Sequence, residues 1–378
     1  MIDICIVGGG AAGMTAAICA KERNPALDIL IIEKKEQMGK KILASGNGKC
    51  NLSNIRCQNF QETLAFFAHL GLLTRTDEEG RIYPYTEEAR AVLMALKKRL
   101  EVLGIRTMVD SPVLSVDKEE CFQIHTSRDC LQARKLLISC GGKAGPQFGT
   151  TGDGSKLAKQ LGHHVTRLVP VLTAIDVKED TSKMAGIRAK ARVMLCHRSE
   201  TLAEETGELQ FTKTGVSGIC VFNLSRFLLI PEGKTMKDGF EEYQILIDFF
   251  PDREDLLEVL TERRKMRGFE REHLLDFLVR EPIAEYIYQL SKGDVKEMAR
   301  LLRCFPLSPK GARGWDYAQV TKGGVSLDEI DLTAMKSRLI ENLYFAGEVI
   351  DYDGPCGGYN LQNAFETGML AGEEMANE

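Results

Sequence analysis

The chain opens on an apolar segment that runs directly into glycines. Ile2–Val7 is almost entirely apolar, and such a short run predicts a buried β-strand. Small residues recur from Ala11 to about Arg23, a pattern that predicts a close-packed helix. A second apolar run, residues 28–32, ends at Glu33. Strand, glycine turn, helix and strand in this order predict the first βαβ unit of a parallel α/β sheet.

The glycines between this strand and helix match the pattern G-x-G-x-x-G. Gly8 allows a tight turn, Gly10 lets a pyrophosphate approach the backbone, and Gly13 lets the helix pack close to the strand. Ala12 lies in the same turn. Glu33 can accept hydrogen bonds from ribose hydroxyls and would repel a 2′-phosphate, which argues against NADP in this site. A glycine-rich turn without a ligand is the alternative, and it leaves the ordered succession of parts unexplained.

The segment 34–51 is basic, rich in glycine and without apolar periodicity, so we expect a loop. Basic side chains and loop amides suit a ligand with two phosphates, although a solvated surface loop is the alternative. The candidate ligands in this segment are Lys34, Lys41, Gly46, Asn47, Gly48 and Asn51.

Near the C-terminus, a strand-like run ends in Gly347-Glu348, and a glycine-rich segment then precedes a predicted helix over residues 361–375. In flavin disulfide reductases and their relatives, such a strand delivers a carboxylate to the ribityl chain of FAD. The N-terminus of the following helix faces the flavin pyrimidine ring, where reduced flavin carries negative charge. The sequence therefore predicts FAD rather than NAD, with Asn360 as helix N-cap and with Leu361 and Gln362 offering their amides to the flavin.

Two further positions fall where related flavoproteins touch the dinucleotide. A buried-type strand over residues 136–140 ends in Gly141-Gly142. Val113 follows Pro112 where relatives make a backbone contact to adenine, although it also fits an ordinary strand residue. Between these segments and the C-terminal one, residues 165–250 carry alternating or apolar runs and residues 254–304 carry helical spacing.

These segments together resemble the BaiN/YhiN-like flavoproteins, also known as the aminoacetone-oxidase family of FAD-binding enzymes. The resemblance implies an α/β fold in which a discontinuous Rossmann-type, glutathione-reductase-like FAD-binding domain (1–164 and 313–378) carries a β-rich, barrel-like subdomain (165–251) and a small helical subdomain (252–312). By family analogy, Lys322 and Cys356 are the catalytic candidates near the isoalloxazine; a structural lysine and a loop thiol of no function are the alternatives. The motifs that carry the resemblance are IVGGGAAGMTAA (6–17), GKKILASGNGKCNLSN (39–54), TTGDGSKLAKQLGH (150–163), FTKTGVSG (211–218), VTKGGVSLDEID (320–331) and FAGEVIDYDGPCGGYNLQNAFETG (345–368).

Composition narrows the class of protein. A net charge of −5 and a pI near 5.9 argue against a nucleic-acid partner bound by charge. No apolar run is long enough for a transmembrane helix and no signal peptide is expected, so the expected location is the cytoplasm. The 11 cysteines include no C-x-x-C pair and fit reduced thiols in the cytosol. Flavin disulfide reductases need two cysteines four residues apart, whereas Cys50 stands alone in its loop and Cys57 is seven residues on, so no dithiol relay is expected. No zinc-ligand spacing occurs.

The expected activity is that of an FAD-dependent oxidoreductase. Because no second glycine fingerprint occurs, we expect NAD(P)H to reduce the flavin from a transient site, with hydride then passing to a small organic acceptor, an enone or a quinone-like compound. The alternatives are an FAD-dependent RNA-modifying transferase and a flavin-binding protein without turnover. The sequence alone leaves the choice between NADH and NADPH, the proton donor and the oligomeric state open.

Overall fold

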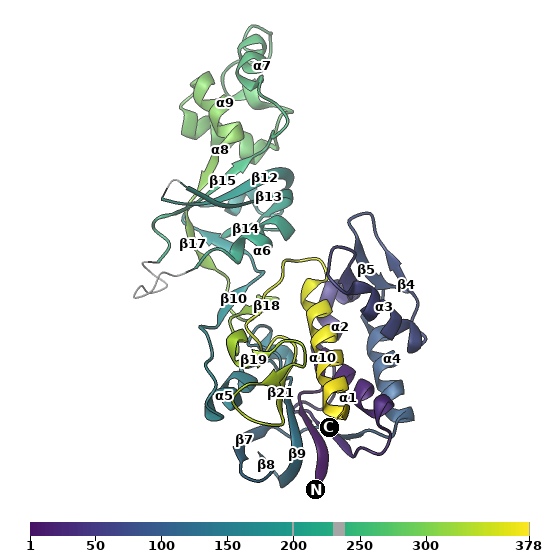
Figure 1. Cartoon of the computed structure of the whole chain (residues 1–378). Helices are drawn as coiled ribbons and strands as arrows, with labels where there is room; N and C mark the ends of the chain where they lie inside the picture. The colour runs from purple at the N-terminus through teal and green to yellow at the C-terminus, as the bar shows by residue number, and fades with distance from the viewer. Residues whose placement is uncertain (199, 230–238, 378) are drawn as a thin grey trace. The chain divides into compact units, whose positions relative to one another are not determined.

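The computed structural model describes residues 1–198, 200–229 and 239–377. The chain divides into two compact units, which we call the first unit (Met1–Pro170 with Gln319–Glu378) and the insert unit (Val171–Ala318). Each unit has its own cluster of buried apolar side chains. Figure 1 follows the chain through both units. Short strands lie where the chain leaves and re-enters the first unit, β10 (Val169–Val171) and β18 (Val320–Lys322).

The main sheet of the first unit is built around parallel strands. β1 (Ile2–Val7) pairs in parallel with β2 (Ile29–Ile32) on one side and with β9 (Cys130–Ile138) on the other, so the βαβ prediction is confirmed. Val7 lies opposite both Ile32 and Ile138, which brings three carboxyl strand ends to one edge. The other strands of this sheet are β6 (Arg106–Met108), β7 (Val113–Lys118), β8 (Phe122–Thr126), β19 (Ile330–Asp331), β20 (Lys336–Ser337) and β21 (Leu343–Phe345).

Two helices from opposite ends of the chain pack together without intervening side chains. They are α1 (Ala11–Arg23) and α10 (Tyr359–Asn377), which lie side by side in Figure 1. An added Cβ at Gly368 would lie 2.6 Å from the carbonyl oxygen of Ala12, so the two backbones are nearly in contact. The remaining elements of this unit are α2 (Lys40–Ala44), β3 (Ser53–Asn54), α3 (Phe60–His69), β4 (Thr74–Thr76), β5 (Arg81–Pro84), α4 (Ala89–Val102) and α5 (Asp153–Gln160).

The insert unit combines an antiparallel sheet with helices around one core. Its central strands, β12 (Arg188–His197) and β13 (Glu200–Phe211), pair along nearly their whole length. Buried residues of the sheet and of the helices belong to the same apolar cluster, so the separate β-rich and helical subdomains stay a prediction. The other elements are β11 (Ile175–Val177), β14 (Gly215–Ser217), α6 (Ile219–Ser225), β15 (Tyr243–Asp248), α7 (Leu256–Arg263), α8 (Glu281–Ser291), α9 (Val295–Arg303), β16 (Phe305–Leu307) and β17 (Pro309–Ala312).

The unit boundaries lie six residues later than the sequence predicts, at 170/171 and 318/319. Val165 forms a β-bridge with Val325, which keeps the first of these segments in the first unit. Arg313 donates to Ala174 O and pairs with Asp176, which holds the second segment in the insert unit. Long-range pairs of this kind leave no signal in local sequence.

Two predictions, one of a strand and one of a loop, need correction. The predicted strand over residues 136–140 ends at Ile138 and begins earlier, at Cys130. The predicted loop 34–51 contains α2 and a 3₁₀ turn, Ser45–Gly48. These pieces are too short to show helical periodicity, which is why the pattern was that of a loop.

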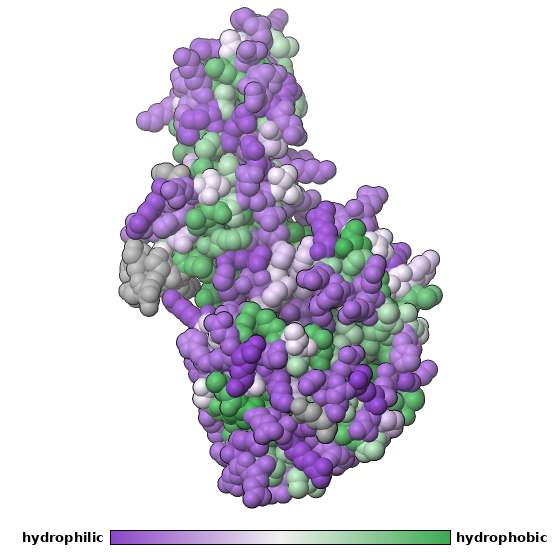
Figure 2. Space-filling model, in the orientation of Figure 1, coloured by the Kyte–Doolittle hydropathy of each residue, from purple (hydrophilic) through white to green (hydrophobic). Residues whose placement is uncertain are grey.

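The face of the molecule drawn in Figure 2 is mainly hydrophilic, and its hydrophobic residues lie in scattered small groups. Among the described residues, no helix is long and apolar enough to cross a membrane.

The packing of α1 on α10 predicts an unusual response to alanine. In most helix interiors Gly→Ala stabilises by about 0.5–1 kcal/mol. An added Cβ at Gly372, however, would lie 2.4 Å from the main-chain oxygen of Ala16. We therefore expect Gly372→Ala to lower the free energy of unfolding by about 1–3 kcal/mol in urea denaturation. The exposed neighbour, as Glu373→Ala, is the matched control and should change stability by less than about 0.5 kcal/mol. Unchanged or increased stability of Gly372→Ala would contradict the close packing.

Candidate functional site

The glycine turn after β1 has the geometry that its sequence predicts. Gly8 has φ +113°, and an added Cβ would lie 2.5 Å from Ser139 O. At Gly13 an added Cβ would lie 2.0 Å from Gly8 O, whereas at Gly10 it would meet nothing within 4 Å. α1 has neither a side-chain cap nor an acidic residue in its first turn. Its N-terminal amides are therefore left for an anion that approaches past Gly10.

Glu33 is held beside this turn by the strand edge. Its Oε2 accepts from Gly9 N at 3.0 Å and its Oε1 from Lys35 N at 2.9 Å. Carboxylate oxygens have further lone pairs, so the group can still accept from ribose hydroxyls. Ser111 N donates to Glu33 O, which brings the start of the β7 segment, and with it Val113, close to this edge.

Lys34 turns toward α5 in an ion pair that the sequence did not predict. Its Nζ lies 2.5 Å from Asp153 Oδ2 and 2.7 Å from Thr151 Oγ1. Burial alone would raise the pKa of Asp153, but hydrogen bonds from Lys34 and Thr151 outweigh burial and the pKa is lowered. Asp153 is therefore an ionised partner for Lys34 at neutral pH.

A second cluster joins three candidates that lie far apart in sequence. Lys41 Nζ lies 2.6 Å from Glu348 Oε2 and donates to Ala144 O at 3.1 Å. The other oxygen of Glu348 accepts from Thr321 N at 2.8 Å. At Gly142, an added Cβ would lie 2.8 Å from Glu348 Oε1. Lys41, Gly142 and Glu348 therefore form one network, which also includes Thr321, a residue that no sequence pattern marks.

The start of α10 differs from the prediction. The helix begins at Tyr359, so Asn360 lies in the first turn and is not the N-cap. Its side chain instead accepts from Gly354 N and donates to Gly354 O, both at 2.9 Å. The amide of Gln362 donates to Gly358 O inside the helix and is not offered outward, as the prediction had it. An asparagine that binds the preceding loop and one that caps a helix look alike in sequence, because both use the same short side chain.

Two asparagines of the 39–54 motif hold the glycine pair before this helix. In the orientation that satisfies its hydrogen bonds, Asn51 Oδ1 accepts from Gly358 N at 3.1 Å. Asn54 Nδ2 donates to Gly357 O at 3.0 Å. Gly357 and Gly358 have φ +117° and +103°, a region that glycine enters without strain. The other loop candidates, Gly46, Asn47 and Gly48, are exposed and have left-handed backbone.

The two catalytic candidates, Lys322 and Cys356, lie in the first unit. Lys322 Nζ is 3.9 Å from Asp353 Oδ1, whose side chain is 12% exposed. Cys356 Sγ is 3.9 Å from Gln319 Oε1. Gly141, with φ +72°, precedes the Gly142 network, and Gly347 precedes Glu348.

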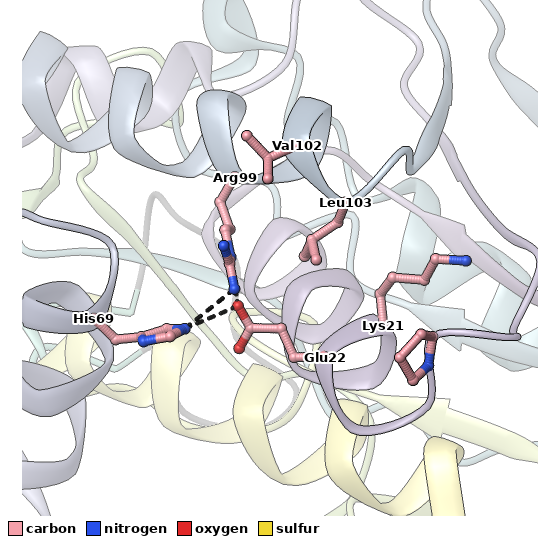
Figure 3. Close-up of a pocket in the computed structure, with 7 residues that line it drawn as sticks. Lys21, Glu22, His69, Arg99, Val102 and Leu103 are labelled. Carbon is pink, nitrogen blue, oxygen red and sulfur yellow. Dashed lines mark hydrogen bonds and ion pairs between the residues drawn. The ribbon is translucent and has the colours of Figure 1, made fainter.

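A surface pocket of about 570 Å³ lies elsewhere on the first unit (Figure 3). Glu22 Oε1 accepts from Arg99 Nε at 2.5 Å and lies 3.1 Å from His69 Nε2. The pocket lies at the C-terminal end of α1, about 18 Å along the helix from the glycine turn. It is therefore separate from the glycine site. The remaining residues that line it are Lys21, Pro25, Val102 and Leu103.

The residues at the sheet edge fit a dinucleotide. An uncapped helix N-terminus faces open space at Gly10, a carboxylate stands beside it at Glu33, and a second carboxylate with a lysine stands at Glu348. Within the described ranges, no group of three potential metal ligands occurs. The chemistry that such a site supports is that of a bound organic cofactor.

The family match and the full-length similarity to a named reductase, together with this fold, identify an FAD-dependent oxidoreductase. The chain belongs to the family whose model is described as the HI0933-like protein Rossmann domain, which matches residues 2–64 and 55–374. The resemblance drawn from the motifs is thereby confirmed.

The similar proteins extend over the whole chain. The chain is 34% identical over 415 residues to the 3-dehydro-bile acid delta(4,6)-reductase of Clostridium scindens, covering 100% of this chain and 99% of that protein. It is 27% identical over 408 residues to the ribosomal RNA dihydrouridine synthase of Escherichia coli (strain K12), covering 99% and 98% of the two chains.

Solved structures show the same fold at low identity. A 3-ketosteroid delta1-dehydrogenase from Sterolibacterium denitrificans matches with a TM-score of 0.52 at 13% identity, covering 99% of both chains. A flavocytochrome c3 fumarate reductase in its open conformation matches with a TM-score of 0.51 at 16% identity, covering 100% of this chain and 78% of that one.

Two thiols of the site segments, those of Cys50 and Cys140, have pKa values raised by burial. No disulfide joins any of the 11 cysteines, all of which lie in the described part of the chain. Burial raises the pKa of the Cys50 thiol to about 11 and that of Cys140 to about 12. These two thiols are therefore protonated at neutral pH and poor nucleophiles.

We expect Cys50 to resist alkylation in the native protein. At about pH 8, roughly one Cys50 thiol in a thousand is ionised, so iodoacetamide should leave it unlabelled while the exposed Cys130 reacts. Mass spectrometry of the labelled peptides measures both sites in one sample, and unfolding in urea should make Cys50 react. Native labelling of Cys50 as fast as Cys130 would show that the thiol is accessible and ionised.

Proposed function

We propose that the protein is a reductase that takes hydride from NAD(P)H and delivers it to a carbon–carbon double bond conjugated to a carbonyl group in a small organic acceptor. The observation that carries this proposal is the similarity over the full chain to a relative named 3-dehydro-bile acid delta(4,6)-reductase. That name describes a 3-ketone with conjugated double bonds. The proposal extends to the class of unsaturated ketones and not to that particular substrate.

The proposed placement of FAD follows the strand edge of the first unit. The pyrophosphate lies past Gly10 at the N-terminus of α1, with a ribose on Glu33. Glu348, Lys41 and Gly142 hold the middle of the cofactor, and the first turn of α10 faces the pyrimidine ring. When bound, FAD supplies the hydride-transfer chemistry. The remaining predicted contacts, kept as part of this proposal, are Gly8, Ala12, Gly13, Lys34, Gly46, Asn47, Gly48, Asn51, Val113, Gly141, Gly347, Asn360 and Leu361. Gln362 is left out, because its amide is used by Gly358 O.

Reduction of a conjugated double bond also needs a proton at the carbon next to the carbonyl group. Lys322 is the proposed donor, because an ammonium group carries the proton and Asp353, 3.9 Å away, orients it. Cys356 is the second candidate, since its thiol lies in the glycine loop before α10. The insert unit is built on an antiparallel sheet, and a transient site for NAD(P)H is part of this proposal.

A second candidate acceptor is uridine in RNA. Uridine has a double bond conjugated to a carbonyl, so the same hydride chemistry applies, and two relatives carry the name ribosomal RNA dihydrouridine synthase. One observation on this chain favours it. Arg264, Arg267 and Arg271 are exposed, and no ion pair joins them to the described residues, so these three charges are available to phosphates. This candidate ranks below the unsaturated ketone because the named RNA relatives are less similar to the chain.

Anaerobic mixing experiments test the function directly. The FAD-loaded protein should lose its flavin absorbance on addition of NADH or NADPH and regain it when a 3-oxo-4-ene steroid is added. Mass spectrometry should then find the saturated ketone. A matched saturated ketone is the control and should leave the flavin reduced. Reoxidation by uridine-containing RNA alone would favour the second candidate, and failure of both nicotinamides to reduce the flavin would refute the proposed reductant.

The proposed role of Glu33 is tested by FAD retention. A charge-assisted hydrogen bond to a ribose contributes about 1.5–3 kcal/mol, so Glu33→Ala should raise the FAD dissociation constant roughly tenfold or more. The control is Glu36→Ala, since Glu36 is exposed and pairs with Lys40. Fluorescence of released FAD measures both variants. Equal FAD affinity of wild type and Glu33→Ala would remove Glu33 from the site.

A further inference from the structure

Thr321 occupies the centre of the Lys41–Glu348 network and is 0% exposed. Its hydroxyl oxygen accepts from two consecutive main-chain amides, those of Lys143 at 2.7 Å and Ala144 at 2.9 Å. Its own amide donates to Glu348 Oε1 at 2.8 Å. One residue of β18 therefore fixes both the loop after β9 and the carboxylate after β21.

Gly142 packs closely against the Thr321 side chain. An added Cβ at Gly142 would lie 2.3 Å from Thr321 Oγ1 and 2.6 Å from its Cβ. Because residue 142 is glycine, the loop can pack directly against the Thr321 side chain. The carbonyl oxygen of Ala144, on the same loop, accepts from Lys41 Nζ, so this loop is bound through its amides and a carbonyl.

We propose that Thr321 is a positioning residue for FAD. Its hydroxyl holds the loop at Gly142–Ala144 and its amide holds Glu348. The site for the middle of the cofactor, formed by Gly142 and Glu348, is therefore in place before FAD binds. This inference rests on the proposed placement of FAD at Glu348 and Gly142. Thr321 also precedes Lys322 in β18, so the strand that positions this site also positions the proposed proton donor.

The physical basis is preorganisation. A site whose groups are already locked binds its ligand without ordering them at that moment, and loss of the lock weakens binding without removing a direct contact. Replacement of the Thr321 hydroxyl by a methyl group would leave two main-chain amides, that of Ala144 buried and that of Lys143 partly buried, without their acceptor. The loop would then shift to find water, and Glu348 would lose its fixed distance from Gly142.

The experiment compares three variants of the FAD-loaded protein. Thr321→Val keeps the shape and removes the hydroxyl, whereas Thr321→Ser keeps the hydroxyl. Thr166→Val is the matched control, because the Thr166 hydroxyl accepts from Gly324 N on the same re-entry segment without contact to Glu348. Two properties are measured. The fluorescence of released FAD gives the FAD dissociation constant, and the bound flavin gives an absorption spectrum and a midpoint potential.

We expect Thr321→Val to raise the FAD dissociation constant at least about tenfold and to change the flavin spectrum or potential. Thr321→Ser should stay within about threefold of wild type, and so should Thr166→Val. Wild-type FAD affinity, spectrum and potential in Thr321→Val would overturn the proposal. Equal losses in the valine and serine variants, or in Thr166→Val, would also overturn it, because the hydroxyl would not be the cause.

A fourth variant separates this inference from the proposed function. Glu348→Gln should itself weaken FAD binding if the cofactor lies at Glu348. Normal FAD affinity in Glu348→Gln would refute the placement of FAD, and the inference with it. Weak binding in Glu348→Gln together with normal binding in Thr321→Val would refute the role of Thr321 and leave the placement intact.

Discussion

Parallel pairing of β1 with both β2 and β9 is the constraint on which the site depends. In a parallel sheet, the carboxyl ends of neighbouring strands share one edge, so the residues that follow them must meet. Gly8 follows β1, Glu33 follows β2, and Ser139 follows β9. β21 pairs in parallel with β9 and brings Glu348 to the same edge. The glycine turn, both carboxylates and the adjacent loops are therefore consequences of strand direction.

The sequence predicted well what local geometry decides. The roles of Gly8 and Gly13 follow from steric demands within one turn, and their added Cβ atoms meet main chain as expected. The βαβ unit was predictable because its period changes from strand to helix and back. Glu33 was predictable from its place after β2, and its carboxylate does lie beside the glycine turn.

The sequence predicted poorly what depends on distant partners. The ion pair of Lys34 with Asp153 joins segments more than a hundred residues apart, and no local pattern predicted it. Thr321 lies in the motif over residues 320–331, but no sequence pattern around it indicates that its hydroxyl accepts from two amides of another loop. Asn360 shows a different kind of error. Its residue type correctly indicated a hydrogen-bonding side chain near the helix start, but its position relative to that start was wrong. Because the helix starts two residues earlier than predicted, the Asn360 side chain does not cap the helix and instead accepts a hydrogen bond from Gly354 N in the preceding loop.

The close contact between α1 and α10 has a consequence for the order of events during synthesis. α1 ends at Arg23, whereas α10 begins at Tyr359 and β21 at Leu343. At translation rates of about 5–20 residues per second, tens of seconds separate the emergence of the two helices. Throughout that interval the small-residue face of α1 lacks α10 and the open edge of β9 lacks β21. The first unit therefore reaches its native packing only after the insert has been made, and the nascent chain must keep an apolar surface covered until its last helix arrives.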